Sequence, residues 1–497
     1  MLPGNEDRIP SRAIGDGAGT SLGTAFKSQL ERHPAQSGIH LLSHGLDAFV
    51  GRAVTARLAE RSIDVQYYMF RQGTVGRLLI RELVAAADRG VRVRMLIDDM
   101  YGGEADAVWL ALDAHPNMEV RLFNPFARGR SKNLQFITRL KTVNHRMHSK
   151  SFTVDNQISI VGGRNIGDEY FAADPNLAFA DMDVMAIGPV VPEVSEAFDL
   201  YWNNERAYPV ATLMAPPQAG AVDRLRDDLA AFHREKQTSV YVDALKNSAL
   251  AEGLRGQKAQ FSFAPTRVIY DSPDKLMKGE GWKEALLISQ LAPYIQQATR
   301  EFILVSPYFV PGQRAADALC ALSRKGVRVR ILTNSLVSND VVAVHAGYMR
   351  HRAQLVRCGV ELYELNETIR KRQGKRFTWL PGLSKSSLHA KVMAIDGEIM
   401  FVGSLNFDPR SLNINNEIGI LFHEPQLAAS ASKRFDEHIG DVAFKVSLVS
   451  RGNGKQRLQW SATEEGNEIV FDSEPYAGFW KILGVNLMRA LPIDAML

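Results

Sequence analysis

The chain has 497 residues, of which 45% are hydrophobic, and this is enough for the cores of two to four domains. Its 59 lysines and arginines nearly balance its 55 aspartates and glutamates, so the formal charge is only +4 and attraction to phosphates must come from local clusters. The presence of only two cysteines, Cys320 and Cys358, argues against a disulfide framework and is typical of a reducing compartment. No apolar run reaches the length of a membrane-spanning helix, so none is expected.

The first 28 residues contain Glu6, Asp7 and Asp16 among scattered glycines and serines, without an apolar run. This composition does not fit a signal peptide. We expect residues 1–28 to form a disordered extension.

A strand–helix–strand unit is predicted in each half of the chain. The first has strands over 63–68 and 91–97 around an amphipathic helix over 74–89; the second has strands over 302–308 and 327–332 around a helix over 315–325. The run Arg-Gly-Val-Arg-Val-Arg that starts at Arg89 recurs, with one Lys for Arg, at Lys325. An internal duplication of an α/β unit with parallel strands explains the repeat.

The pattern His-x-Lys-x4-Asp-x6-Gly-Gly/Ser-x-Asn also occurs twice. Its copies consist of His148, Lys150, Asp155, Gly163 and Asn165, and of His389, Lys391, Asp396, Ser404 and Asn406. Apolar runs on both sides of each aspartate predict a hairpin that turns there, and His and Lys two apart on a strand share a face. The aspartates are therefore expected to hold the turns.

This pattern favours chemistry on a phosphodiester. Lysines and asparagines can supply the positive charge and the donors that the phosphate oxygens need, so no metal or other cofactor is expected. Imidazole can act as a nucleophile or as a general acid. A lone histidine is more often a satisfied core residue, whereas two in repeated constellations favour one shared active site. His145, His345 and Asp98–Asp99 receive no role.

The duplicated motif resembles that of the phospholipase D superfamily. Similarity to its bacterial cardiolipin synthases, above all the C type, extends from about Gln29 to the C-terminus and includes the segments 64–68, 143–170, 334–363 and 407–411. The resemblance implies an α/β fold of two tandem phospholipase D-like α/β/α domains, over 29–205 and 261–445, that form an intrachain pseudo-dimer. Residues 206–260 would be a helical linker or insertion, either a cover of the cleft or a connector, and 446–497 a C-terminal segment.

The resemblance also implies roles for the site residues. His148 would form a phosphohistidine with a phosphatidyl donor, and His389 would protonate the departing alcohol and then activate a hydroxyl of phosphatidylglycerol to give cardiolipin. Phosphate contacts would come from Lys150, Lys391, Asn165, Asn406, Gly163 and Ser404; Asp155 and Asp396 complete the catalytic motif; and Asp183 and Glu417 would orient the histidines. The order of the histidines, the donor (phosphatidylethanolamine or phosphatidylglycerol) and transfer against hydrolysis stay open.

Three basic or amphipathic stretches bear on membrane association. The loops over 126–150 and 370–391 carry lysines and arginines with apolar inserts and no carboxylate, which suits an anionic bilayer, although a solvated charged loop is the plainer reading. The tail over 476–491 is amphipathic and could lie in the membrane surface or pack on the second domain. The resemblance implies peripheral association with the cytoplasmic face of the bacterial inner membrane; the oligomeric state is not legible.

Two rival functions are kept. A phospholipase or nuclease of the same superfamily would hydrolyse its substrate, although the apolar inserts favour lipid over nucleic acid. A non-catalytic scaffold that binds phosphate or membrane is the rival from another class, and two complete motifs argue against it.

Overall fold

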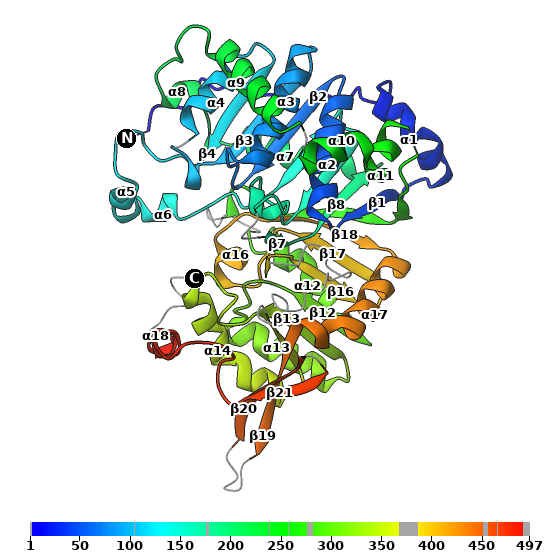
Figure 1. The fold of residues 1–497 in the computed structure, drawn as a ribbon, viewed down its shortest axis with the longest axis vertical. Helices are drawn as coiled ribbons and strands as arrows, with labels where there is room; N and C mark the ends of the chain where they lie inside the picture. Colours follow the sequence, from blue (N-terminus) through cyan, green and yellow to red (C-terminus); the bar gives the residue numbers. More distant parts are fainter. Residues whose placement is uncertain are drawn as a thin grey trace.

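The computed structural model describes residues 2–103, 105–174, 178–237, 239–256, 258–275, 282–366, 386–450, 456–464 and 466–490. Two mixed β-sheets dominate the fold, and the two domains built on them lie one above the other in Figure 1. Helices cover both faces of each sheet, so the predicted pair of α/β/α domains is present.

The first sheet contains nine strands. Their order is β10 (Ser262–Ala264), β1 (Ser37–Leu42), β8 (Asp183–Ile187), β6 (Ile158–Gly162), β5 (Ser151–Val154), β2 (Ser62–Tyr67), β3 (Arg92–Asp98), β4 (Met118–Phe123) and β9 (Ala207–Pro209). The motif hairpin β5–β6 is antiparallel, whereas β2, β3 and β4 run parallel to one another, as the strand–helix–strand pattern predicts.

The second sheet repeats this order. It runs β11 (Thr266–Tyr270), β18 (Ile418–His423), β17 (Ile399–Gly403), β16 (Val392–Ile395), β12 (Glu301–Val305), β13 (Arg328–Asn334), β14 (Glu361–Leu365), β19 (Ala443–Ser450), β20 (Gln456–Glu464) and β21 (Asn467–Phe471). The series β8-β6-β5-β2-β3-β4 thus corresponds to β18-β17-β16-β12-β13-β14. The inferred duplication is visible as a repeated topology.

The helices bury apolar faces against the sheets. In the first domain these are α2 (Gly45–Leu58), α3 (Thr74–Asp88) and α4 (Asp106–Asp113) on one face and α7 (Val190–Trp202) on the other; in the second they are α12 (Leu287–Gln296), α13 (Gly312–Arg324) and α14 (Val342–Arg357), with α17 (Pro425–Val442) opposite. Helices α3 and α13 are followed by Gly90 and Gly326, at φ +94 and +92, where a side chain would be strained.

The domains share a continuous apolar core. Val161 and Val184 of the first sheet belong to the same buried cluster as Val402 and Ile420 of the second. The chain crosses between the sheets at Pro265, because β10 pairs with β1 while β11 pairs with β18. This crossing lies close to the expected start of the second domain at 261.

Residues 206–260 are not a separate linker or a cover over the domain seam. Strand β9 extends the first sheet, and α8 (Val210–Leu213), α9 (Ala221–Glu235), α10 (Val240–Asn247) and α11 (Ala249–Arg255) follow it. Helices α9, α10 and α11 pack on α2 and α3. The hydroxyl of Tyr241 in α10 donates to the carbonyl of Phe171 at 2.7 Å. The segment therefore completes the outer face of the first domain.

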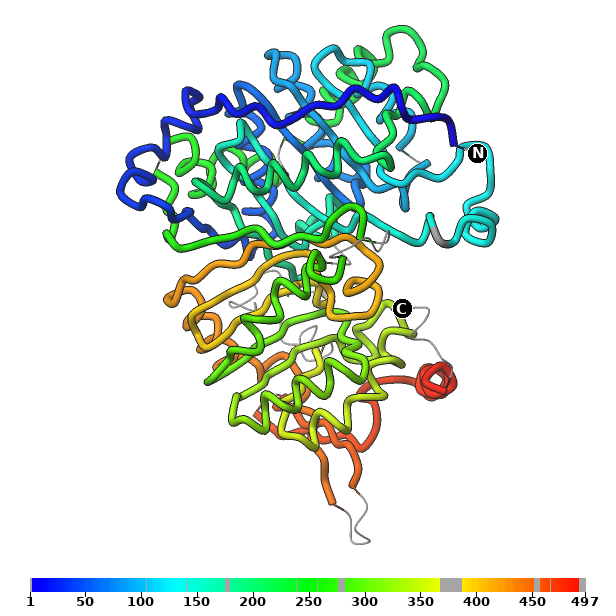
Figure 2. The backbone as a smooth tube through the Cα atoms, turned by 180° about the vertical axis from the view of Figure 1, so that it is seen from behind, coloured from blue at the N-terminus to red at the C-terminus, as the bar shows by residue number. Residues whose placement is uncertain are grey.

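The expectation of a disordered N-terminal extension is wrong. Residues 2–20 follow the first domain (Figure 2) before α1 (Ser21–Arg32) begins. The guanidinium of Arg94 donates to the Ser11 carbonyl at 3.1 Å, and the backbone N–H of Ala13 donates to Asp199 of α7 at 2.8 Å. Composition could not reveal these partners, because they come from β3 and α7.

The C-terminal segment belongs to the second domain. Strands β19, β20 and β21 extend its sheet, so the expected boundary at 446 falls inside β19. Helix α18 (Phe479–Ala490) then packs on α14, with Val485 buried. Among the described residues, no helix combines the length and the apolar character needed to cross a bilayer.

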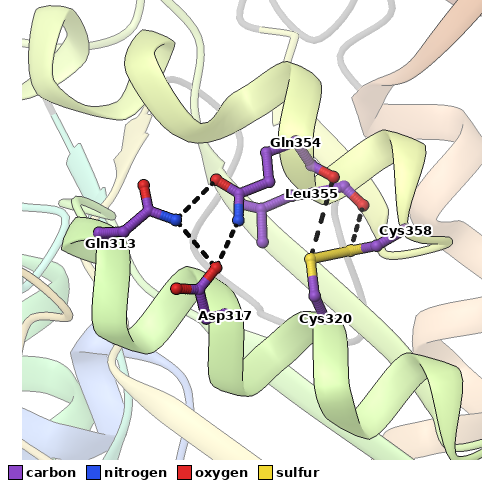
Figure 3. Close-up of a disulfide and its surroundings, with 6 residues drawn as sticks. All are labelled: Gln313, Asp317, Cys320, Gln354, Leu355 and Cys358. Carbon is purple, nitrogen blue, oxygen red and sulfur yellow. Dashed lines mark hydrogen bonds between the residues drawn. A yellow bond between two sulfur atoms is a disulfide. The ribbon is translucent and has the colours of Figure 1, made fainter.

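The two cysteines correct another expectation. Cys320 in α13 and Cys358 just after α14 form a disulfide (Figure 3). The two helices also meet through Asp317, which accepts hydrogen bonds from Gln313 and Gln354 at 2.8 and 2.7 Å. A cysteine count could exclude a framework of several bridges, but not a single bond between two cysteines whose Cα atoms lie 5.4 Å apart in the folded chain.

Candidate active site

The two motif histidines lie on the seam between the domains. Strand β15 (Ser386–Leu388), which leads into the second motif, pairs in parallel with β7 (Ala178–Ala180) of the first domain. The N–H of His389 donates to the Ala180 carbonyl at 2.8 Å, and the N–H of His148 donates to the Asn416 carbonyl, also at 2.8 Å. Each histidine is thus fixed by the backbone of the other domain.

A carboxylate from the opposite domain holds each imidazole. Nδ1 of His148 lies 2.8 Å from Glu417 Oε2, and Nδ1 of His389 lies 2.6 Å from Asp181 Oδ2. Both carboxylates are buried, and each follows directly the carbonyl that binds the histidine backbone. Because Nδ1 is occupied, Nε2 is the nitrogen left to meet a substrate.

The prediction that Asp183 orients a histidine is wrong. Asp183 is the first residue of β8, and its carboxylate binds the buried guanidinium groups of Arg52 at 2.9 Å and Arg164 at 3.3 Å. Asp181 takes the predicted role. The sequence held a signal for this: Asp181 and Glu417 are separated by the same offset as Arg89 and Lys325.

The two glycine-led turns serve these carboxylates. A Cβ on Gly163 would lie 2.2 Å from Asp181 Oδ1, so the close carboxylate requires glycine. At the matching position, the Ser404 hydroxyl donates to Glu417 Oε2 at 2.5 Å. Gly163 therefore leaves room for Asp181, and Ser404 holds Glu417; the phosphate contacts expected of both residues stay a prediction.

The motif lysines are buried beside the imidazoles. Lys150 and Lys391 are 1% and 2% exposed, and Nζ of each donates to the carbonyl of its own motif histidine. Lys391 Nζ also lies 2.8 and 3.2 Å from the two ring nitrogens of His389. Burial lowers the pKa of Lys150 to about 7 and that of Lys391 to about 8. The buried carboxylates of Glu417 and Asp181 oppose this shift at both lysines.

Burial also keeps both imidazoles neutral in the empty site. It lowers the pKa of His148 to about 4 and that of His389 to about 3, and the charges of Lys150 and Lys391 act in the same direction while the carboxylates oppose it. Each histidine responds to the lysines of both domains, which places the two motifs within one electrostatic site.

The motif asparagines complete the site. Asn165 and Asn406 are 2% and 5% exposed. The Asn165 amide donates to the Tyr170 hydroxyl at 3.0 Å, and the Oδ1 atoms of both asparagines have no hydrogen-bond partner within the described structure. These oxygens are acceptors, so only the amide N–H groups of the two asparagines can meet a phosphate oxygen.

The motif aspartates lie at the far ends of β5 and β16 from the histidines. Asp155 accepts hydrogen bonds from the N–H groups of residues 60, 61 and 62, and Asp396 from those of residues 299, 300 and 301. Both adopt positive φ, 52 and 55, in the hairpin turns. They tie the turn to the neighbouring strand, in agreement with the hairpin reading.

Aromatic rings pack against both imidazoles. These aromatic residues had been assigned no role from the sequence. Tyr68 lies 4.9 Å from the His148 ring, while Tyr170 and Phe179 lie 5.0 and 5.3 Å from His389. Asp98 accepts the N–H of Met147 at 2.8 Å and binds Arg146, so it fixes the approach to the first motif. These contacts join residues remote in sequence, and no local pattern marks them.

One group in the described chain has a spacing that would suit a metal ion. Ligand atoms of His345, Glu364 and Glu474 lie within 4.8 Å of one another. The Arg352 guanidinium, however, donates to Glu364 at 2.8 Å and to Glu474 at 2.5 Å. A fixed guanidinium thus already binds both acids, and the group anchors the segment before α18.

The two predicted basic loops differ in what the structure describes. Most of the loop over 370–391 lies outside the described residues. In the loop over 126–150, Arg128 pairs with Asp99 and Asp106, whereas Leu134, Ile137 and Leu140 are 52%, 80% and 54% exposed. The apolar inserts of this loop therefore face outward.

Comparisons with known proteins agree with this geometry. The family model described as "Cardiolipin synthase, PLD-like domain" matches residues 55–202 and 291–439. The chain is 40% identical to cardiolipin synthase C of Escherichia coli over 476 residues, covering 96% of this chain and 99% of the relative, and 24% identical to a cardiolipin synthase of Staphylococcus aureus, covering 86% and 72%.

A solved structure supports the fold. The phosphatidylserine synthase of Haemophilus influenzae superimposes with a TM-score of 0.52 at 14% identity, over 86% of this chain and 91% of that one. The double match to the family model and the full-length similarity lead to one conclusion: this chain belongs to the cardiolipin synthase family built on phospholipase D-like domains.

Proposed function

We propose that the protein synthesises cardiolipin by transferring a phosphatidyl group to phosphatidylglycerol through a phosphohistidine. The observation that carries the proposal is the reciprocal pairing of His148 with Glu417 and of His389 with Asp181 across the domain seam. This pairing leaves the Nε2 side of each ring for a substrate, beside two buried lysines. Both similarity to synthases and this geometry support transfer chemistry on a lipid phosphodiester.

The first step breaks the bond between phosphorus and the donor headgroup. Nε2 of neutral His148 attacks phosphorus, and the headgroup oxygen leaves with the proton that Nε2 of protonated His389 donates. Glu417 stabilises the charge that develops on the His148 ring through Nδ1. The products are the free headgroup alcohol, a phosphatidyl-histidine and neutral His389.

The second step forms cardiolipin. Neutral His389 accepts the proton of a phosphatidylglycerol hydroxyl, the hydroxyl oxygen attacks phosphorus, and the P–N bond to His148 breaks. His389 ends protonated and His148 ends neutral, so the site is ready for the next donor. The assignment of the nucleophile to the first motif follows the resemblance to the superfamily, and the site's symmetry permits the exchanged order.

The lysines and asparagines would stabilise the transition state. Lys150 and Lys391 supply positive charge at the non-bridging oxygens, and the Nδ2 groups of the buried Asn165 and Asn406 can donate to them. An entering phosphate also adds negative charge beside two buried lysines whose counter-charges, Asp181 and Glu417, are already engaged by the histidines. The same anion raises the pKa of His389, so that the general acid is charged only when a substrate is bound.

We further propose that the enzyme works as a peripheral membrane protein. Helix α18 packs on α14 through Ile482 and Val485 but leaves Phe479 and Trp480 70% and 78% exposed. On the first domain, α5 (Lys132–Thr138) and α6 (Leu140–Val143) expose Leu134, Ile137 and Leu140. Figures 1 and 2 show α18 and α5–α6 on the same side of the molecule, one on each domain.

This side would meet the bilayer. Apolar side chains gather there beside Arg130, Arg139, Lys481 and Arg489, a combination that suits an anionic lipid surface better than water. One face of α18 packs on the second domain, and we propose that the other face meets the membrane.

The reaction is tested with purified protein and vesicles that contain labelled phosphatidylethanolamine and phosphatidylglycerol. Labelled cardiolipin is expected from the wild type and from Lys433→Ala, which removes an exposed lysine of α17, but not from Lys391→Ala. Release of phosphatidic acid without cardiolipin would favour a phospholipase, and cleavage of single-stranded DNA a nuclease. Label in only one lipid at a time identifies the donor.

The order of the histidines has a separate test. Labelled phosphate should be trapped covalently in His389→Ala and not in His148→Ala, because the first variant keeps the nucleophile and lacks the acid. Trapping in His148→Ala alone would reverse the assignment.

A further inference from the structure

A surface cavity of about 730 Å³ lies beside the first motif and has no role in the chemistry described so far. It is lined by Phe70, Arg71, Gln72, Met100, Tyr101, Gly102, Ala105 and Lys132. Tyr101 forms one wall and lies 5.6 Å from the ring of Tyr68, which in turn lies 4.9 Å from the imidazole of His148. Two aromatic contacts therefore separate the cavity wall from the reacting nitrogen.

The cavity carries donors suited to an anion. The Arg71 side chain is 54% exposed, and only its Nη1 is engaged by Glu169, at 2.9 Å. Lys132 Nζ donates to the carbonyls of Met100 and Gly102 at 3.2 and 2.6 Å, and its ammonium has a third proton to offer. Gln72 Nε2 is buried without a hydrogen-bond partner in the described part of the chain.

The nearby acids do not outweigh these cations. Asp99 and Asp106 share the single guanidinium of Arg128, at 2.6 and 2.8 Å, and Glu169 pairs with Arg71. Three carboxylates therefore face three cations, and the cavity attracts an anion through its open donors and not through a surplus of positive charge. A buried amide N–H without a partner is costly unless a ligand fills the position.

Cardiolipin formation requires a second phosphate near the first. The acceptor hydroxyl belongs to a lipid whose own phosphodiester lies one glycerol unit from the reacting phosphorus. The buried lysines of the motifs serve the donor phosphate, so the acceptor phosphate needs a separate cationic position at the edge of the site. The cavity offers such a position on the side of His148.

We propose that the cavity formed by Arg71, Gln72, Tyr101 and Lys132 binds the phosphate of the acceptor glycerophospholipid. The inference rests on the proposed transferase function and extends it to acceptor selection. Binding there holds the glycerol headgroup so that its free hydroxyl reaches His389, and it favours a lipid acceptor over water. The helix α5, which starts at Lys132, exposes Leu134 and Ile137 on the presumed bilayer side, so an acceptor can enter directly from the membrane.

The test compares two acceptors that both offer a glycerol hydroxyl, of which only phosphatidylglycerol carries a phosphate. Wild type, Arg71→Gln, Lys132→Gln and Gln72→Met are supplied with phosphatidylethanolamine vesicles and with either phosphatidylglycerol or free glycerol. Each variant should raise KM for phosphatidylglycerol about ten-fold more than KM for glycerol, since only the former carries a phosphate. Lys27→Gln, which removes an exposed lysine of α1, is the charge control and should change neither.

Gln72→Met separates binding from folding. Replacing a side chain whose buried Nε2 lacks a partner with an apolar one should leave the melting temperature unchanged or higher, while KM for phosphatidylglycerol rises. Equal changes in both acceptors, or no change for phosphatidylglycerol, would refute the acceptor site. Failure of the wild type to transfer to either acceptor would instead refute the transferase function.

Discussion

Asp181 of the first domain accepts the Nδ1 proton of His389 of the second at 2.6 Å, and Glu417 of the second does the same for His148 of the first at 2.8 Å. The relationship is reciprocal, and the carbonyls one residue before each acid bind the histidine backbones. Neither domain therefore contains a complete catalytic group. The shared apolar core keeps the two half-sites in register.

This reciprocity predicts different outcomes for two neighbouring aspartates. Asp181→Asn should lower kcat by roughly 100-fold or more, because an amide can donate to Nδ1 and select the wrong tautomer of His389. Asp183→Asn should instead lower the melting temperature, since it leaves the buried guanidinium groups of Arg52 and Arg164 short of a counter-charge.

The two variants control for each other. Steady-state cardiolipin formation and thermal unfolding are measured on both proteins in the same vesicles and buffer. A loss of kcat confined to Asp183→Asn would return the orienting role to that residue and contradict the assignment of Asp181.

The pKa values predict that anion binding takes up protons. At pH 7 the empty site holds neutral His148 and His389, with pKa values of about 4 and 3, and a Lys150 that is close to half charged, with a pKa of about 7. A bound anion favours the charged form of each group and raises these pKa values. Affinity for orthovanadate should therefore fall as pH rises from 6 to 8, by up to about ten-fold per pH unit for each proton coupled to binding.

Calorimetry in buffers of different ionisation enthalpy measures the protons directly. About one proton per vanadate is expected at pH 7 for the wild type, and fewer for His389→Asn. An affinity that is independent of pH would mean that both lysines and one imidazole are already charged in the empty site.

The pH dependence of folding stability has the opposite sign to that of anion affinity, because stability rises with pH. Both histidines have pKa values below the 6.5 of the unfolded chain, so the unfolded state binds more protons as pH falls from 6.5 toward 4. Stability contributed by the neutral rings is present above pH 6.5 and is lost on acidification. The melting temperature of the wild type should thus decline below pH 6.5 more steeply than that of His389→Asn.

Local pattern and duplication made much of this site predictable. The motif spacing identified the histidines, the lysines and the hairpins, and the repeat indicated two equivalent domains, because these features depend on residues close in sequence. Asp181 was missed because the orienting role was assigned to the neighbouring Asp183, although the offset from Asp181 to Glu417 equals that from Arg89 to Lys325. Ordered residues 2–20 and the Cys320–Cys358 bond were missed because their contacts exist only in the folded chain.

Asp155 should matter for stability and not for chemistry. It is fully buried and accepts three backbone N–H groups at the end of its hairpin, so Asp155→Asn should lower the free energy of unfolding by about 1–3 kcal/mol. The folded variant should keep a kcat within a few-fold of the wild type.

Asp396→Asn, at the more exposed equivalent turn, should lower the free energy of unfolding by less. Denaturant unfolding and parallel activity assays compare the two variants. A kcat loss as large as that of His148→Asn would place Asp155 in the chemistry.

The disulfide should stabilise the second domain without serving the reaction. Closing a loop with a sequence separation of 38 residues is worth at most roughly 4 kcal/mol in the unfolded-chain model. Dithiothreitol should therefore lower the melting temperature and leave kcat at 25 °C unchanged, and Cys320→Ser/Cys358→Ser should reproduce both results. Loss of activity on reduction would point to a redox role.

The same bond bears on the compartment. The cytoplasmic face of the inner membrane is proposed from the family resemblance, whereas a stable disulfide favours an oxidising compartment. Alkylation of thiols in intact cells, followed by denaturation and mass measurement, distinguishes them. Two alkylated cysteines support the cytoplasmic face, and two protected cysteines place the second domain on the oxidising side.

The two faces of α18 should separate membrane binding from folding. Phe479→Ser/Trp480→Ser removes exposed apolar side chains, each worth about 1.5–3 kcal/mol when buried in lipid, so vesicle binding should weaken at least ten-fold with little change in melting temperature. Val485→Ser removes a buried contact with α14 and should lower the melting temperature. Lys481→Gln is the matched control for charge.

Co-sedimentation with anionic vesicles, and the blue shift of tryptophan emission that insertion of Trp480 would cause, provide two readouts. If Phe479→Ser/Trp480→Ser binds vesicles as well as the wild type, α18 is a packing element only, and attachment must come from the apolar edge of α5 and α6.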